Sequence, residues 1–260
     1  MKKRISAIIL SFNEEDFIEA AIQSVAFADE IIVLDSYSVD NTVKISQNQK
    51  VRIIQREFDD FSSQKNYAID QADNDWIFFL DADERVTPEL ESEIQQVLLT
   101  ETAEVGYFVH RDFYFLQQRI LYGGWQTDKV MRLFNKKHCR YNGNLVHELI
   151  DYDGEVGFLK NRLKHYSYRS FDHYMKKLIN YSTLQARELY KNKTSVSILK
   201  MLVKPPFRFF ILYIVRLGFM DGFPGFILAS QHSYAVLMRY LKLWIMIKES
   251  ETSLGTDRNV

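Results

Sequence analysis

The chain has 260 residues, of which 47% are hydrophobic, 14% aromatic and 26% charged. This composition excludes a disordered chain, and 10 glycines with 4 prolines exclude a fibrous or low-complexity one. The net charge of −1 hides two opposed blocks, because residues 1–159 carry −12, residues 160–248 carry +13 and the tail 249–260 carries −2. We therefore expect two surfaces with different partners. The single cysteine, Cys139, permits no internal disulfide, which favours a reducing compartment.

The first hundred residues alternate short apolar runs with helical segments. The predicted strands are residues 5–10, 30–35, 51–54 and 75–80. The predicted helices begin at Asn13, Val39, Phe61 and Thr87, the last with Thr87 as its N-cap. This alternation predicts βαβ units and a parallel sheet flanked by helices. The apolar run after Met1 is too short for a signal peptide, and none is expected.

From about residue 104 to residue 168 the pattern changes to short strand-like pieces. They are residues 105–110, 129–134, 145–150 and 162–168. We expect this part to build the acceptor side of a site, and we place residues 1–168 in one catalytic domain.

Residues 169–260 read as a basic, aromatic helical extension. A helix is predicted from Phe171 onward, with a break at Pro205-Pro206. Residues 207–219 and 226–247 are strongly apolar but carry charges, and neither provides the roughly 18–20 uncharged residues of a membrane span. Basic residues among aromatic ones are typical of helices that lie in a membrane interface. The alternative is a helical hairpin packed on the catalytic domain or on a second subunit.

Polar residues follow directly on three of the predicted strands. They are Ser11 to Glu14, Asp35, and Asp81-Ala82-Asp83. Ligands of parallel sheets bind at the carboxyl ends of the strands, so we expect these segments to share one site. Two carboxylates one residue apart can hold Mg²⁺ or Mn²⁺ together with phosphate oxygens. The alternative for Asp81 and Asp83 is an ordinary acidic strand end.

As a set, four motifs resemble the family 2 glycosyltransferases, which have the GT-A fold, a Rossmann-like and mostly parallel sheet flanked by helices. The motifs are residues 8–15, 32–42, 64–68 and 79–84. The middle segment, with Gly123-Gly124-Trp125, Arg132-Leu133-Phe134 and Val146-His147-Glu148, resembles the branch that builds the lipopolysaccharide core of Gram-negative bacteria.

The resemblance implies a donor pocket for a nucleotide sugar, with a UDP-hexose expected. Ser11, Asn13 and Glu14 would line it, and Asp35 would accept a hydrogen bond from the uracil or the ribose. Without the motif set, Asp35 would read as a capping residue of a turn.

The resemblance also implies a metal and phosphate site. Asp83, with Asp81 and His147, would hold Mg²⁺ or Mn²⁺, and Asp81 would also touch the ribose or the sugar. Lys65 would approach the diphosphate or Asp81, and Arg132 would contact a phosphate. The alternatives are a solvated helix face for Lys65, a surface salt bridge for Arg132 and a structural role for His147.

Inverting transfer needs a base that removes the proton of the acceptor hydroxyl. In the family, the base usually lies in an acidic pair some sixty residues after the D-x-D, and this points to Glu148. The sequence has His-Glu where Glu-Asp is more common, and Asp128 is the second candidate for the base.

The sequence thus predicts a metal-dependent, inverting hexosyltransferase acting on a lipid-linked saccharide in lipopolysaccharide core or other cell-surface glycan synthesis. The alternatives are a transferase with a polyprenyl phosphate acceptor and a non-catalytic membrane-surface scaffold. Expected partners are an anionic membrane surface and a second copy bound through the C-terminal helices, and no nucleic acid. We expect the protein to be cytoplasmic and peripheral on the inner face of the cytoplasmic membrane.

Overall fold

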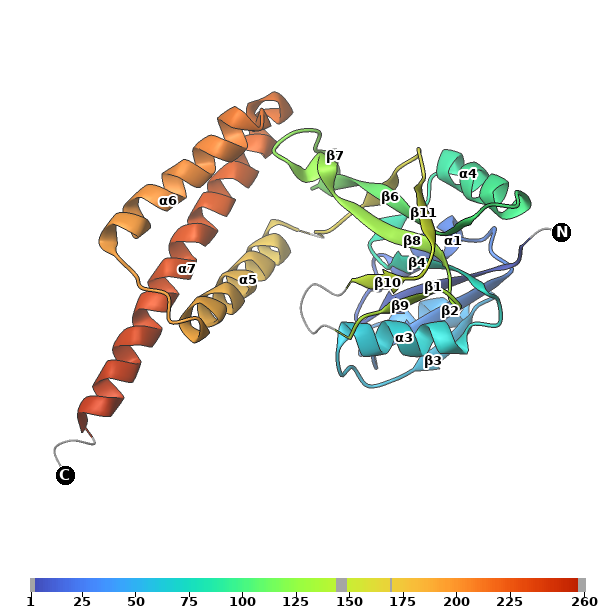
Figure 1. Ribbon diagram of the computed structural model, residues 1–260, viewed down its shortest axis with the longest axis horizontal. Coiled ribbons are helices and arrows are strands. Elements are labelled where there is room, and N and C mark those ends of the chain that lie inside the picture. Colours follow the sequence, from blue (N-terminus) through green and yellow to red (C-terminus); the bar gives the residue numbers. More distant parts are fainter. Residues whose placement is uncertain (1–2, 144–148, 169, 257–260) are drawn as a thin grey trace. The chain divides into compact units, whose positions relative to one another are not determined.

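The computed structural model describes residues 3–143, 149–168 and 170–256, and the side chains up to residue 250. By its internal contacts the chain forms two compact units (Figure 1). We call the first, Met1–Asp112 with Thr127–Ser167, the sheet unit. The second, Phe113–Gln126 with Tyr168–Val260, is the helical unit.

The first half of the sheet unit is the predicted parallel α/β arrangement. Its strands are β1 (Ile5–Ser11), β2 (Glu30–Asp35), β3 (Arg52–Gln55) and β4 (Trp76–Asp81), in the order β3-β2-β1-β4. The helices between and after them are α1 (Ile18–Ser24), α2 (Thr42–Gln47), α3 (Phe61–Gln71) and α4 (Pro88–Leu99). Apolar side chains are buried on both faces of β1 and β4, as expected for central strands covered by helices.

The second half adds antiparallel strands to the same sheet. Strand β8 (Lys129–Asn135) pairs with β4, and β6 (Glu104–Phe115) pairs with β8. Strand β11 (Glu155–Phe158) runs parallel to β6. Beyond them, β12 (Leu163–His165) pairs with the short β5 (Glu84–Arg85), while β9 (Cys139–Tyr141) and β10 (Ile150–Tyr152) form a separate ribbon. The expected strand 145–150 lies largely outside the described residues.

The predicted helix start at Asn13 is wrong. Asn13 has a left-handed backbone with φ of 56°, and α1 begins only at Ile18. The side chain of Asn13 accepts a hydrogen bond from Val39 N–H at 2.9 Å, and Glu14 N–H donates to the Thr42 hydroxyl at 2.7 Å. These bonds tie the loop after β1 to the loop after β2, and the chain turns there before it becomes helical.

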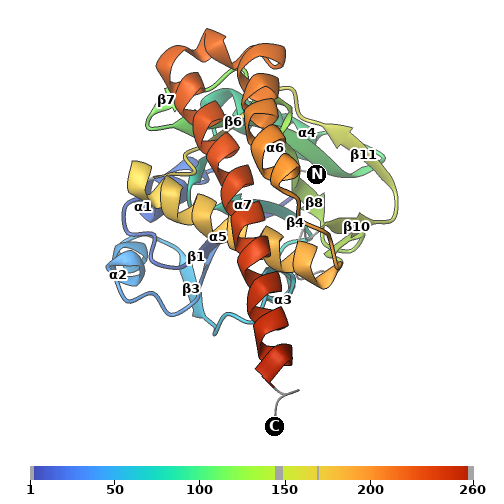
Figure 2. The same ribbon diagram turned by 90° about the vertical axis from the view of Figure 1, so that its left-hand side faces the viewer.

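The helical unit contains three long helices joined by short turns (Figure 2). They are α5 (Phe171–Lys191), α6 (Ile198–Phe210) and α7 (Gly222–Thr256). The π-helix η2 (Ile211–Val215) and the 3₁₀-helix η3 (Gly218–Asp221) connect α6 to α7, which lie side by side as an antiparallel hairpin. The end of β6 and β7 (Gln118–Arg119) also belong to this unit, and η1 (Trp125–Thr127) leads back to the sheet unit.

The predicted helix break at Pro205-Pro206 is also wrong, because both prolines lie inside α6. The break comes earlier, before Ser197, whose hydroxyl caps α6 by accepting from Lys200 N–H at 3.2 Å. Pro205 is buried, and its carbonyl accepts a hydrogen bond from the Ser233 hydroxyl of α7 at 2.7 Å. Packing against α7 therefore holds the helix through the two prolines, which sequence propensity alone disfavours.

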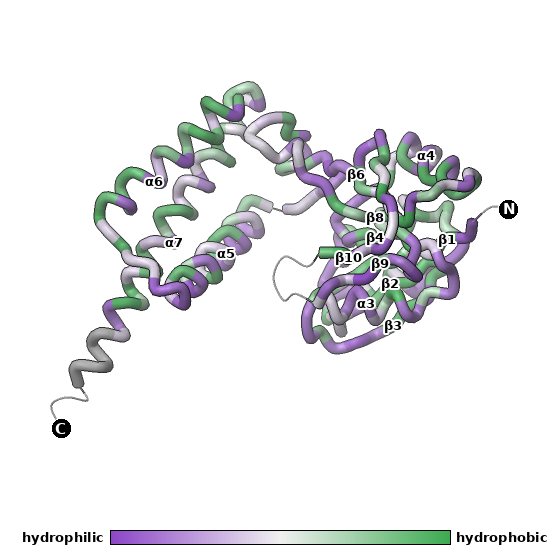
Figure 3. Tube along the Cα trace, viewed as in Figure 1, coloured by the Kyte–Doolittle hydropathy of each residue, from purple (hydrophilic) through white to green (hydrophobic). Residues whose placement is uncertain are grey.

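Within the described part of the chain, none of the helices is by itself both long and apolar enough to cross a membrane. One bent pair, Ile198–Val215 with Gly218–Ser250, meets that criterion jointly, with an angle of 71° between its two parts. Figure 3 shows apolar residues along much of α6 and α7.

Candidate active site

The polar residues predicted at the strand ends do meet at one edge of the sheet. In the β1–β2 register Ser11 lies opposite Asp35, and in the β1–β4 register Leu10 lies opposite Asp81. Because the strands are parallel, their carboxyl ends place these side chains in a row. The edge is therefore a candidate ligand site.

Asp35 organises the loops on the β1–β2 side of this edge. Its carboxylate is fully buried and accepts hydrogen bonds from the Ser11 hydroxyl at 3.1 Å and from Ser38 N–H at 2.9 Å. Asn13 N–H donates to the Ser38 hydroxyl at 2.8 Å, which extends the network into the β1 loop. Asn13 and Glu14 thus belong to a preformed loop pair, and a nucleotide contact by Asp35 stays a prediction.

The end of β4 carries a buried network of alternating charges. Arg132 of β8 forms ion pairs with Asp81 and with Glu84, and the Glu84 contact is 2.6 Å. Glu84 also accepts from Arg111 at 3.1 Å and from the backbone N–H of Asp81 at 3.1 Å. Arg132 is therefore a buried partner of the D-x-D turn and not a surface salt bridge.

Electrostatics keep this network ionised. Burial alone would raise the pKa of Asp81, but Arg132, Lys65 and Arg111 outweigh it and hold that pKa well below its ordinary range. Burial alone would lower the pKa of Arg132, yet the carboxylates of Asp81 and Glu84 raise it. Asp81 is thus a permanent carboxylate.

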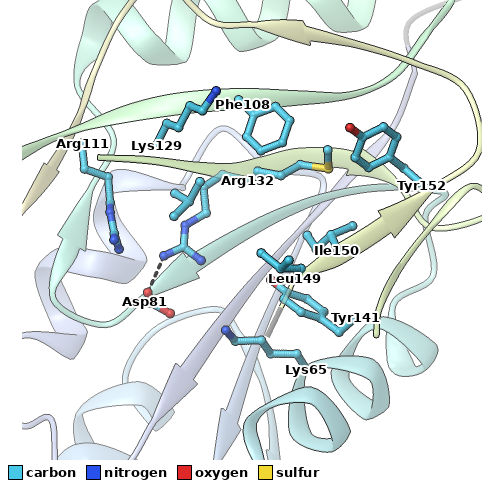
Figure 4. A pocket seen from close by; sticks show the side chains of 12 residues that line it. Lys65, Asp81, Phe108, Arg111, Lys129, Arg132, Tyr141, Leu149, Ile150 and Tyr152 are labelled. Atoms are coloured by element: carbon cyan, nitrogen blue, oxygen red, sulfur yellow. Dashed lines mark hydrogen bonds and ion pairs between the residues drawn. The ribbon is translucent and has the colours of Figure 1, made fainter. Parts of the chain in front are cut away.

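A pocket of about 450 Å³ opens beside Asp81 (Figure 4). Its lining combines cationic side chains with aromatic and aliphatic ones: Lys65, Asp81, Phe108, Arg111, Lys129, Val130, Met131, Arg132, Tyr141, Leu149, Ile150 and Tyr152. Lys65 is buried on α3 rather than solvated, with its amine 4.8 Å from the centre of the Tyr141 ring and pointing toward Asp81. The pocket therefore offers charged groups for an anion and apolar walls for a sugar ring.

Asp83 lies beside a histidine that the sequence analysis did not single out. The Nε2 atom of His165 is 3.4 Å from a carboxylate oxygen of Asp83. The pairing of β12 with β5 causes this, because His165 lies opposite Glu84 in the register and Tyr166 N–H donates to the Asp83 carbonyl at 2.8 Å.

An oxygen and a nitrogen donor at this spacing fit one divalent cation such as Mn²⁺ or Mg²⁺. Among residues 3–143, 149–168 and 170–256, no three His, Cys, Asp or Glu side chains converge as a metal cage. Remaining ligands would come from substrate oxygens and water, as is usual for Mg²⁺. The predicted metal ligand His147 lies outside the described residues.

The two predicted bases differ in what the structure says of them. Glu148 lies outside the described residues. Asp128 accepts from Arg111 through Nε at 2.8 Å and through Nη2 at 2.6 Å. A carboxylate held in such a bidentate pair is a poor proton acceptor, which disfavours Asp128 as the base.

Sequence reasoning thus missed Glu84, Arg111 and His165. Glu84 followed the D-x-D directly and could have been found from that position. Arg111 and His165 come from strands without a motif, 28 and 82 residues after Asp83. Only antiparallel pairing brings them to the site.

Comparison with known proteins identifies the class to which this fold and site belong. The family model described as Glycosyl transferase family 2 matches residues 6–152, more than half of the chain. The chain therefore belongs to this family of glycosyltransferases. The predicted α/β fold of the GT-A type is confirmed, with its parallel β3-β2-β1-β4 half followed by antiparallel strands.

Two relatives match nearly the whole chain. An uncharacterized glycosyltransferase of Rickettsia bellii is 30% identical over 94% of this chain and 87% of its own length. The lipopolysaccharide core biosynthesis glycosyltransferase LpsC of Rhizobium meliloti is 27% identical over 94% of this chain and 93% of its own. Similarity to the lipopolysaccharide core branch is thus confirmed.

Among solved structures, the chain is similar to glucosyl-3-phosphoglycerate synthase from Mycobacterium tuberculosis in complex with Mn²⁺, UDP and glucosyl-3-phosphoglycerate. The identity is 23%, the match covers 43% of this chain and 44% of that one, and the TM-score is 0.36.

Proposed function

We propose that this glycosyltransferase is inverting and metal-dependent, and that it moves a hexose from a UDP-sugar to a lipid-linked saccharide of the lipopolysaccharide core. The observation that carries the proposal is the arrangement at the end of β4. There Asp83 lies 3.4 Å from His165, and Asp81 is held as a carboxylate beside the pocket.

The donor would bind where the β1 and β2 loops meet the D-x-D turn. Ser11, Asn13 and Glu14 belong to the loop pair at the carboxyl edge of the sheet, where nucleotides bind in such folds. The amine of Lys65 points toward Asp81, and its charge would offset the negative charge of the leaving diphosphate.

Asp83 and His165 would hold the divalent cation. When bound, the cation supplies Lewis-acid stabilisation of the charge that develops on the diphosphate. Asp83 and His165 would fix its position, and Asp81, which Arg132 and Glu84 orient, would face the ribose or the donor sugar.

The acceptor saccharide would occupy the pocket of about 450 Å³. Phe108, Tyr141 and Tyr152 would cover the apolar faces of its rings. Glu148 stays the predicted base that removes the proton of the acceptor hydroxyl. Asp128 is engaged by Arg111, which favours Glu148 over it.

We also propose that the protein is peripheral on the inner face of the cytoplasmic membrane, bound through α6, η2 and α7. The support is composition and exposure. Large apolar side chains that are 43% exposed or more lie along this hairpin: Leu199, Leu202, Phe207, Phe210, Ile214, Val215, Leu217, Phe219, Met220 and Phe223. Apolar side chains among basic ones are typical of interfacial helices.

The test is UDP release from a panel of UDP-hexoses with Mn²⁺ or Mg²⁺ and a lipid-linked core acceptor. We expect Asp83→Ala and His165→Ala each to reduce the rate by at least about a hundredfold, as is typical when a metal site or its outer ligands are lost. Asp73→Ala is the matched control, because its carboxylate is 80% exposed. Near-normal rates for both site variants would refute the metal role, and a wild-type protein that cleaves no UDP-hexose would refute the donor.

A further inference from the structure

We propose that Arg208, Arg216 and Arg239 of the helical unit form a binding site for the phosphate group of a membrane lipid. This inference rests on the membrane association proposed above and adds a defined site and ligand to it. The site consists only of residues from the α6–α7 hairpin and its turn.

The hairpin lacks carboxylates to balance its arginines. Residues 198–248 contain seven Lys and Arg side chains and a single acidic residue, Asp221. Asp221 is already engaged, since its two carboxylate oxygens accept the backbone N–H groups of Leu121 and Tyr122, each at 2.9 Å. The positive charge of the hairpin therefore has no internal counter-ion.

Arg208 lies on the inward stripe of α6. Residues 201, 205, 208 and 212 repeat at the spacing of one helix face, and Pro205 and Leu212 on either side of Arg208 are buried. Arg208 itself is half-buried, and within the described residues its guanidinium has no hydrogen-bond or ion-pair partner. A guanidinium has five N–H donors, so this position leaves strong donors unsatisfied.

The electrostatic neighbours of Arg208 are also arginines. Burial lowers the pKa of Arg208, and the charges of Arg216 and Arg239 lower it further. Arg239 donates to Gln185 at 3.2 Å, but its buried Nε atom has no partner in the part of the chain that the structure describes. Three guanidinium groups thus gather in a partly desolvated place with no anion to offset their repulsion.

The π-helix η2 contributes to this gathering. In an α-helix, residues eight apart such as Arg208 and Arg216 would be turned by about 80° from each other. A π-helix has more residues per turn, which brings Arg216 back toward the face of Arg208. Such local π segments often mark functional sites.

Phosphate is the anion that best fits clustered guanidinium groups, because their planar forks donate paired hydrogen bonds to its oxygens. A lipid is the expected carrier. Exposed apolar side chains such as Phe207, Phe210 and Ile214 lie on the same hairpin and would enter the acyl region while the arginines hold the headgroup.

The experiment measures binding of the full-length protein to vesicles of phosphatidylcholine, alone or mixed with phosphatidylglycerol. The test variant is Arg208→Gln with Arg216→Gln. The control is Lys176→Gln with Arg187→Gln, which removes the same charge from exposed positions of α5. We expect the test variant to lose about fivefold per arginine on phosphatidylglycerol vesicles, and the control to bind like the wild type. Equal loss in both variants, or no loss in the test variant, would overturn the site.

Two further arms identify the ligand. Vesicles charged with oleate in place of phosphatidylglycerol should bind less well, and equal binding would show that charge rather than phosphate is recognised. Inorganic phosphate at constant ionic strength should leave the melting temperature unchanged. A rise that the double variant abolishes would assign the site to free phosphate and overturn the lipid.

Thermal unfolding without lipid separates this role from a structural one. Arg208→Gln removes an unpaired charge, so its melting temperature should rise, whereas loss of a structural arginine would lower it. If the double variant does not fold, Arg208→Lys keeps the charge but loses the fork and should still bind phosphatidylglycerol vesicles less well. The transfer assay and the vesicle assay fail independently, so failure of one proposal leaves the other testable.

Discussion

Glu84 is the residue on which the D-x-D turn depends, and Glu84→Gln tests this directly. Its side chain is fully buried and joins the two guanidiniums of Arg132 and Arg111 to the backbone N–H of Asp81. Glutamine keeps the size of the side chain but removes its charge. Two buried arginines then share one fewer carboxylate, and one end of the amide must face them with a donor.

Removing one partner of a buried ion pair costs about 3–5 kcal/mol, because the remaining charge is left uncompensated. For a chain of this size such a loss lowers the melting temperature by roughly 10 °C. The turn that carries Asp81 also loses an anchor, and displacement of a reacting group by about 1 Å reduces turnover up to about a hundredfold.

The assay is thermal unfolding by circular dichroism, together with kcat/KM for the donor. Glu101→Gln is the matched control, since Glu101 is exposed and its substitution should change the free energy of unfolding by less than about 0.5 kcal/mol. If Glu84→Gln melts within a degree of the wild type and keeps its kcat/KM, the buried charge network does not hold the turn and the reasoning is wrong.

Three more predictions concern the helical unit. Asp221→Ala removes two charge-assisted acceptors and should lower the free energy of unfolding by about 2–4 kcal/mol in urea titrations, with Asp172→Ala as an exposed control. Gly124→Ala should cost about 1–3 kcal/mol in the same titrations, since its φ is +101° and a Cβ there would lie 2.2 Å from Arg216; an unchanged midpoint would contradict the described loop. Burial and Arg208 lower the pKa of His232 to about 4, from 6.5. The unfolded chain therefore gains a proton first as pH falls below 6.5, and stability should drop by up to about 3 kcal/mol by pH 4, a dependence that His232→Gln should lose.

Much of the donor half could be predicted because its signals are local. The apolar runs that became β1 to β4 are buried on both faces, and parallel strands place the residues after their carboxyl ends at one edge. The N-cap at Thr87 is equally local, and its hydroxyl accepts from Leu90 N–H at 3.2 Å. The helix start at Asn13 failed for the opposite reason, because bonds to residues 25 to 28 positions later decide the conformation there.

The acidic and basic blocks, the parallel sheet and the carboxylates of the D-x-D were determined by the sequence alone, since they depend on composition, periodicity and position after a strand. Only the tertiary structure decided which side chains meet those carboxylates. His165 reaches Asp83 and Arg132 reaches Asp81 through antiparallel pairing of distant strands, whose register no local pattern encodes. It likewise assigned residues 113–126 to the helical unit, where Asp221, about a hundred positions later, holds their backbone. Contacts so far apart in the chain follow from the packing of the whole fold, and they become visible only when it is complete.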